Sequence, residues 1–115
     1  MALNIQHLES GISVVVLEGR LDSAQAKEFI GLVNAAADQN RVKLILDMAQ
    51  VDFVDSSGLG SLVVAHKQVN NRGGDIKIIS LRPEVRTIFE LTRLHRIFDI
   101  FETLDIARNQ FLCDP

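Results

Sequence analysis

Short apolar runs alternate with longer segments of helical periodicity, and this alternation constrains the fold more than any other feature of the chain. The most apolar run, residues 42–47, is almost continuously aliphatic, which is typical of a central strand covered on both faces. Strand and helix patterns then alternate to the end of the chain. We therefore expect a single α/β domain over residues 1–115, with a mixed but mostly parallel sheet.

The sheet is expected to open with an antiparallel hairpin. Leu3 and Ile5 mark a short strand, Glu9-Ser10-Gly11 offers a turn, and the Val-rich residues 12–18 form the returning arm. The expected order is β-β-α-β-α-β-α-β-α, with about four helices. These begin at Asp22 or Ser23, at Ser57, at Pro83 and after Thr103, while residues 51–54 read as a separate short apolar segment.

Composition excludes several classes of function. The 115 residues are 47% apolar and carry a net charge of −3, with no basic run that could follow a phosphate backbone, so direct nucleic-acid binding is not expected. Uncharged apolar runs fall far short of the ~18 residues of a membrane span. The single cysteine, Cys113, fits a reducing compartment. We expect a soluble, cytoplasmic protein without a membrane partner.

The segment 51–60, Val-Asp-Phe-Val-Asp-Ser-Ser-Gly-Leu-Gly, is the strongest candidate site. It places two hydroxyls between the carboxyl end of a strand and the amino end of a helix, where sites of open α/β sheets concentrate. A helix amino terminus tolerates added negative charge, so a phosphate on Ser56 would not melt the helix. Gly58 and Gly60 leave room for another backbone. The alternative is that Ser56 is simply an N-cap and the glycines are packing choices.

Other kinds of site fit the sequence less well. Val54 stands where a nucleophile elbow needs glycine, Val63 where a dinucleotide loop needs its third glycine, and no phosphate-binding P-loop is present. The histidines are scattered, and His66 reads as a semi-buried packing residue. A Mg²⁺ pocket of a phosphoacceptor receiver domain fits poorly, because the chain starts with a hairpin and no Lys follows the strand at residues 75–80. We expect no catalytic residue, no metal and no cofactor.

Taken together, the motifs resemble the STAS-domain family, and within it the bacterial anti-sigma factor antagonists. The resemblance covers nearly the whole chain and includes the hairpin and the following motifs: Gly19-Arg20-Leu21-Asp22, Leu44-Ile45-Leu46-Asp47, Asp55-Ser56-Ser57-Gly58-Leu59-Gly60, Gly73-Gly74, Pro83-Glu84-Val85 and Leu91-Thr92-Arg93-Leu94.

The resemblance implies a phosphorylation switch on Ser56. In such proteins the unmodified form binds an anti-sigma factor that is also an ATP-dependent Ser kinase, and so frees a sigma factor for transcription. Phosphorylation by that partner weakens the complex, and a metal-dependent Ser phosphatase restores it. ATP and Mg²⁺ would then belong to the partner kinase, and this chain would be a signalling protein, not an enzyme.

The resemblance also assigns roles around Ser56. Asp22 is expected to orient Ser56, Asp55 to shape the loop and its recognition by the kinase, and Ser57 to support the start of the helix. Gly58, Leu59 and Gly60 complete the expected switch and partner-binding segment. Ser61 and the exposed side of the helix over residues 57–70 are further contact candidates.

Two other hypotheses stay open. The domain could be a STAS scaffold, or a subunit associated with a transporter, in which Ser56 is never modified. An enzyme with Ser56 as nucleophile is the least favoured, because no motif places a histidine as its base.

Overall fold

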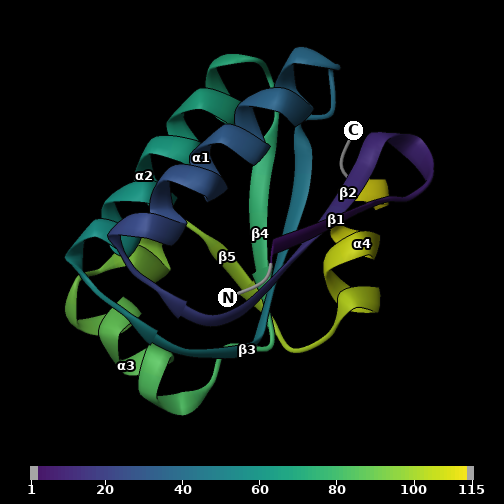
Figure 1. The fold of residues 1–115 in the computed structure, drawn as a ribbon. Helices are drawn as coiled ribbons and strands as arrows, with labels where there is room; N and C mark the ends of the chain where they lie inside the picture. Colours follow the sequence, from purple (N-terminus) through teal and green to yellow (C-terminus); the bar gives the residue numbers. More distant parts are fainter. Residues whose placement is uncertain (1–2, 114–115) are drawn as a thin grey trace.

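The computed structural model describes residues 3–113, and Figure 1 shows a twisted sheet with helices on both of its faces. The elements follow the expected order of strands and helices. They are β1 (Leu3–His7), β2 (Ile12–Leu21), α1 (Ser23–Asp38), β3 (Lys43–Val54), α2 (Ser56–Asn71), β4 (Asp75–Ile79), α3 (Pro83–Leu91), β5 (Asp99–Phe101) and α4 (Leu104–Cys113), with short 3-10 turns at Glu9–Gly11 and Leu94–Arg96.

The sheet has the order β1-β2-β3-β4-β5 within the described residues. β1 pairs antiparallel with β2, whereas β2, β3, β4 and β5 are parallel to one another. The expected fold class, a single α/β domain with a mixed sheet and an N-terminal hairpin, is confirmed. Because the parallel strands all end at one edge, the loops that follow β2, β3 and β4 meet there.

Two apolar cores lie on opposite faces of the sheet. The larger one includes Phe29 of α1, Leu62 of α2 and Phe89 of α3, packed against the sheet. In Figure 1, α1 and α2 run side by side on this face, and α4 lies across the sheet from them. The smaller core holds Ala107 and Phe111 of α4. This division follows the period of two in the strands, because successive side chains point to opposite faces.

Several helix boundaries agree with local signals in the sequence. Asp22 caps α1, since its carboxylate accepts the backbone N–H of Gln25 at 3.2 Å. Thr103 caps α4, Pro83 stands in the first turn of α3, and Gly73 takes a φ of +82° after α2.

β3 is longer than the sequence indicates. Residues 51–54 are not a separate segment but the end of one strand, which stays paired with β2 through two irregularities in register, between Val16 and Glu18 and between Gly19 and Arg20. Each irregularity gives β3 one extra residue, so polar residues interrupt its apolar pattern while the backbone pairing continues. β2 likewise extends to Leu21.

Lys77 of β4 is buried beneath α4. Its ammonium donates to the carboxylates of Asp75 and Asp99, at 3.2 Å each, and lies 4.6 Å from the centroid of the Phe111 ring. Burial by itself lowers the pKa of Lys77, but the hydrogen bonds and charges of the two carboxylates outweigh it and raise the pKa above 10.5. The charge on Lys77 therefore helps to hold α4 on the sheet.

Candidate partner-binding site at the start of helix α2

The candidate site lies at the edge where the parallel strands end. Leu21 at the end of β2 pairs with Val54 at the end of β3. The residues that follow are Asp22 and Asp55, and the backbone N–H of Asp55 donates to the carbonyl of Leu21 at 3.3 Å. Helices α1 and α2 therefore begin next to each other, each with an aspartate at its amino end.

Asp55, and not Ser56, is the N-cap of α2. Its carboxylate accepts the backbone N–H of Gly58 at 2.9 Å, and Ser56 is the first helical residue. The interpretation of Ser56 as a simple N-cap is therefore wrong. Aspartate and serine are both good caps, and the backbone path out of β3 puts Asp55 in the capping position. The helix thus starts one residue before the predicted Ser57.

Both hydroxyls of the motif are accessible. Ser56 and Ser57 are exposed, and neither side chain makes a hydrogen bond with residues 3–113. Free backbone N–H groups of the first turn give this end of α2 a partial positive charge. The half-buried carboxylates of Asp22 and Asp55 lie nearby and contribute negative charge. A hydroxyl placed in this way can receive a phosphate from an external enzyme without first being released from the fold.

The orienting role expected for Asp22 stays a prediction. One oxygen of its carboxylate is engaged by the N–H of Gln25, and within residues 3–113 no hydrogen bond joins it to Ser56. Asp22 is nevertheless next to the motif, because Leu21 and Val54 are in register. Its position favours an electrostatic influence on Ser56 over direct contact.

The two glycines of the motif differ. A Cβ atom on Gly58 would overlap the carbonyl oxygen of Leu21 and come within 2.9 Å of Val54 Cγ1, whereas one on Gly60 would meet nothing within 4 Å. The close backbone approach at Gly58 is thus made by this chain itself. Gly60 is exposed and open to a partner.

Two residues of α2 that were expected to contact a partner are less accessible than predicted. Ser61 is 3% exposed and donates its hydroxyl proton to the carbonyl of Gly58 at 2.7 Å, so the expectation that it contacts a partner is wrong. Its position follows from the helical period, which brings it to the face of α2 that packs on the sheet. Leu59 is half-buried against the larger core and presents only part of its side chain.

Sequence reasoning missed an exposed pair beside the motif. Arg20 of β2 lies over the ring of Phe53, with its guanidinium carbon 4.2 Å from the ring centroid. An aromatic residue three positions before Ser56 was a signal, but the bulge that brings it opposite Arg20 is not visible in the sequence.

The described residues hold no group of three or more His, Cys, Asp or Glu side chains placed to bind a metal ion. His66, expected to be semi-buried, is half-buried, and lies 3.7 Å from Asp75 and edge-on to Phe98. The side chain of Cys113 lies outside the described residues.

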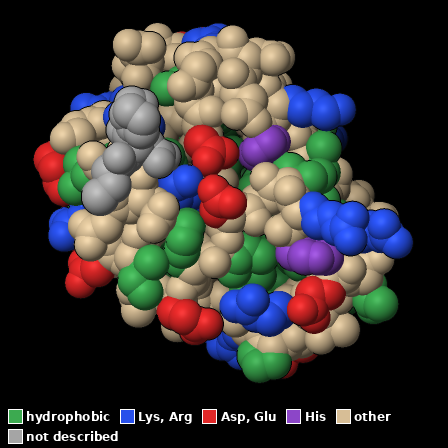
Figure 2. Space-filling model, turned by 180° about the vertical axis from the view of Figure 1, so that it is seen from behind, with side chains coloured by type: hydrophobic (Ala, Val, Ile, Leu, Met, Phe, Trp, Pro, Cys, Tyr) green, Lys and Arg blue, Asp and Glu red, His purple; other side chains and the backbone are tan. Residues whose placement is uncertain are grey.

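On the face that Figure 2 shows, the described acidic and basic side chains are intermixed, so no continuous basic track crosses it. No helix within residues 3–113 has the length and apolar character needed to cross a membrane.

Comparison with known sequences shows the family of this chain. The STAS domain profile matches residues 5–107. The chain belongs to the STAS-domain family. BtrV of Bordetella bronchiseptica, named provisionally as an anti-sigma factor antagonist, is 27% identical over 101 residues, which cover 88% of this chain and 87% of BtrV. The anti-sigma F factor antagonist of Paenibacillus polymyxa is 26% identical over 104 residues, 89% of this chain and 87% of the relative.

Solved structures share the fold of this STAS domain. The phosphorylated form of the Bacillus cell fate determinant SpoIIAA superposes with a TM-score of 0.75 at 20% identity, covering 96% of this chain and 99% of SpoIIAA. The murine anion transporter Slc26a9 contains the same fold, with a TM-score of 0.79 at 18% identity over 98% of this chain and 22% of the transporter.

Proposed function

We propose that this STAS domain is an anti-sigma factor antagonist whose unmodified form binds an anti-sigma factor and frees the sigma factor. The observation that carries the proposal is the exposed Ser56 at the first position of α2, with its N-cap supplied by Asp55. Relatives named as antagonists over nearly the full chain support it. In this proposal the chain acts in the cytoplasm by being bound and modified, and it catalyses no reaction itself.

The proposed switch is phosphorylation of Ser56 by the anti-sigma factor, acting as a Ser kinase with its own ATP and Mg²⁺. A metal-dependent Ser phosphatase reverses it. The phosphate adds about −1.5 to −2 charges at pH 7. The first turn of α2 can accept that charge, because a helix amino terminus carries a partial positive charge, so the folded state persists.

In contrast to the fold, the complex with the anti-sigma factor is expected to be weakened by the phosphate. Asp22 and Asp55 already place two carboxylates at this edge, and a partner that covers it would have to desolvate a third anionic group. A penalty of about 3 kcal/mol lowers affinity by more than a hundredfold. That SpoIIAA is known in a phosphorylated form with this fold supports a switch that leaves the fold intact.

The proposal is tested by incubating the purified protein with its cognate anti-sigma factor and Mg·ATP, and mapping phosphate by mass spectrometry. We expect phosphate on Ser56, none on the Ser56→Ala variant, and normal modification of Ser57→Ala as the matched control. Phosphate on Ser57 alone, or none at all, would contradict the assignment. Equal affinity of the modified and unmodified protein for the factor would exclude the switch.

A second candidate is a scaffold role without modification. The observation that favours it is that the same fold occurs as one part of the Slc26a9 transporter. This role predicts that Ser56 stays unmodified in cells and that Ser56→Asp leaves partner affinity unchanged. Phosphopeptide mapping of the protein isolated from its own cells distinguishes the two candidates.

A further inference from the structure

The exposed pair Arg20 and Phe53 lies close to Ser56 and has no evident role within the fold. Phe53 is 37% exposed, and Arg20 is exposed with its guanidinium over the ring. Within residues 3–113 no carboxylate forms an ion pair with Arg20. The guanidinium of Arg20 therefore contacts the ring of Phe53, while its N–H groups have no carboxylate partner among residues 3–113.

The bulge in β3 is what exposes Phe53. Gly19 pairs with Val51, so a regular register would set Asp52 opposite Arg20 and Phe53 opposite the buried Leu21. The extra residue shifts the register, and Arg20 pairs with Phe53 instead. An aromatic side chain that a regular strand would direct to the core therefore faces solvent, stacked with an arginine.

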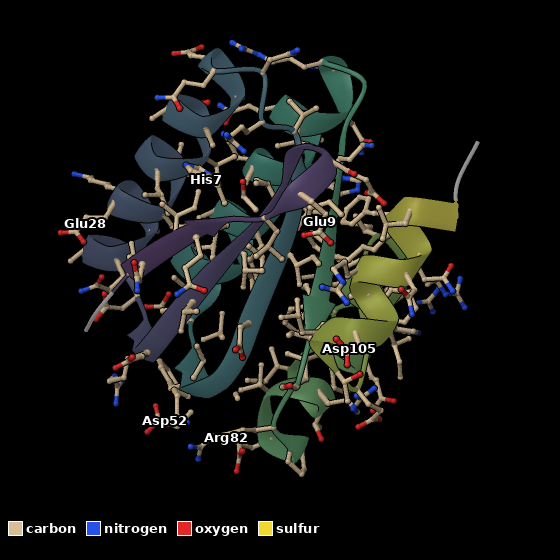
Figure 3. All side chains as sticks on the ribbon, turned by 90° about the vertical axis from the view of Figure 1, so that its right-hand side faces the viewer. His7, Glu9, Glu28, Asp52, Arg82 and Asp105 are labelled. Atoms are coloured by element: carbon tan, nitrogen blue, oxygen red, sulfur yellow. The ribbon has the colours of Figure 1, made fainter. Side chains whose placement is uncertain are left out.

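The pair projects from the face of the sheet opposite α1 and α2. Its neighbours Leu21 and Val54 are buried in the larger core, and adjacent strand residues point to opposite faces. On that second face, α4 and the smaller core bury other residues, including Ile45 of β3. Figure 3 shows the labelled Asp52 at the end of the molecule where β3 stops, away from α4.

A hollow adjoins the pair. It is lined by Gly19, Arg20, Asp22 and Gln25, and so connects Arg20 with the cap of α1. The side-chain oxygen of Gln25 is buried without a hydrogen-bond partner among the described residues. The hollow thus joins Arg20 to the edge of the sheet where α1 begins, beside the start of α2.

We propose that Arg20 and Phe53 are an anchor for the anti-sigma factor, which contacts them with a segment that carries an apolar side chain and a carboxylate. The inference rests on the proposed function, because that function brings this partner to Ser56. The ring of Phe53 receives the apolar side chain, and the N–H groups of Arg20 bind the carboxylate with two parallel hydrogen bonds. Aromatic residues and arginine are the types that carry most binding energy in protein interfaces.

The size of a stable interface supports this extension of the site. A standard interface buries about 800 Å² on each partner, equivalent to a disc of about 16 Å radius. Phe53 precedes Ser56 by three positions, a span of at most about 11 Å between their Cα atoms even for a fully extended chain. An interface of ordinary size centred on Ser56 is therefore wide enough to include Phe53.

The test measures the affinity of the unphosphorylated protein for its purified cognate anti-sigma factor, by calorimetry with Mg·ADP to prevent phosphate transfer. We expect Phe53→Ala to weaken binding at least tenfold and Arg20→Gln several-fold. Ile106→Ala is the matched control, since Ile106 is an apolar side chain of similar exposure, 44%, on α4. It should stay within twofold of wild type. Thermal unfolding shows whether each variant is folded.

A measurement without any variant complements these affinities. Amide NMR signals of residues 19–21 and 52–54 in the wild-type protein should shift when the factor is added, and unperturbed signals there would overturn the inference. If the wild type binds and is phosphorylated on Ser56 while Phe53→Ala binds equally well, only this inference fails. If the wild type does not bind the factor, the proposed function fails, and this inference with it.

Discussion

Replacement of Gly58 by alanine probes how tightly the start of α2 is seated on β2. The added methyl group would overlap the carbonyl oxygen of Leu21 and press on Val54 Cγ1 at 2.9 Å. The atom it meets first belongs to the backbone and cannot rotate away, so the first turn of α2 has to move. That movement also strains the capping bond from the Gly58 N–H to the Asp55 carboxylate, which is 2.9 Å long.

The expected loss of stability follows from these contacts. Overpacking of this kind costs about 1–3 kcal/mol. Weakening of the cap costs up to about 1 kcal/mol, and the better helix propensity of alanine returns up to about 1 kcal/mol. The net loss is therefore about 1–3 kcal/mol, a fall in Tm of about 4–12 °C for a domain of this size.

Gly60→Ala is the matched control, because it adds the same methyl group to the same helix two residues later. Nothing lies within 4 Å of that methyl group, so the change should stabilise the protein by about 0.5–1 kcal/mol. Urea unfolding of both variants against wild type measures the difference. A Gly58→Ala protein as stable as wild type, or equal losses in the two variants, would refute the reasoning.

Three further changes test other parts of the structure. Asp55→Ala should cost about 1 kcal/mol in urea unfolding through loss of the α2 cap, and Asp55→Asn much less; equal losses would argue against capping. Because the pKa of Lys77 is raised in the folded state, its stabilising contribution is full below pH 10.5 and is lost as the pH rises through the folded pKa. Lys77→Met should be less stable at neutral pH and lack this alkaline loss, and an unchanged pH profile would contradict the role of its charge. Arg93 has a φ of +63°, so Arg93→Gly should stabilise the protein by about 1 kcal/mol and raise the midpoint of thermal unfolding. A lower midpoint would show that the Arg93 side chain is itself stabilising.

Features that depend on neighbouring residues were predictable from the sequence. The start of α1, expected at Asp22 or Ser23 and capped by Asp22, and the cap of α4 at Thr103 follow from interactions within a few residues along the chain, as does the left-handed Gly73 after α2. The fold class followed in the same way, because periods of two and 3.6 specify strands and helices locally.

Features that depend on strand register were not predictable. The sequence offered Ser56 as the possible cap of α2, whereas the path of β3 beside β2 puts Asp55 in that position. The same register shifts joined residues 51–54 to β3 and turned Phe53 toward solvent. A bulge changes which residues face each other across two strands, and no local pattern records it.

By itself, then, the sequence determined an α/β domain with a hairpin at its start and an accessible serine where a strand gives way to a helix. Only the tertiary structure decided that Asp55, and not Ser56, caps that helix, and that Gly58 packs against Leu21 while Gly60 stays open. It also decided that Ser61 is buried and that Arg20 stacks on Phe53. The physical reason is that propensity and capping act between residues close in the chain, whereas packing and register depend on strands and helices that meet only when the chain has folded.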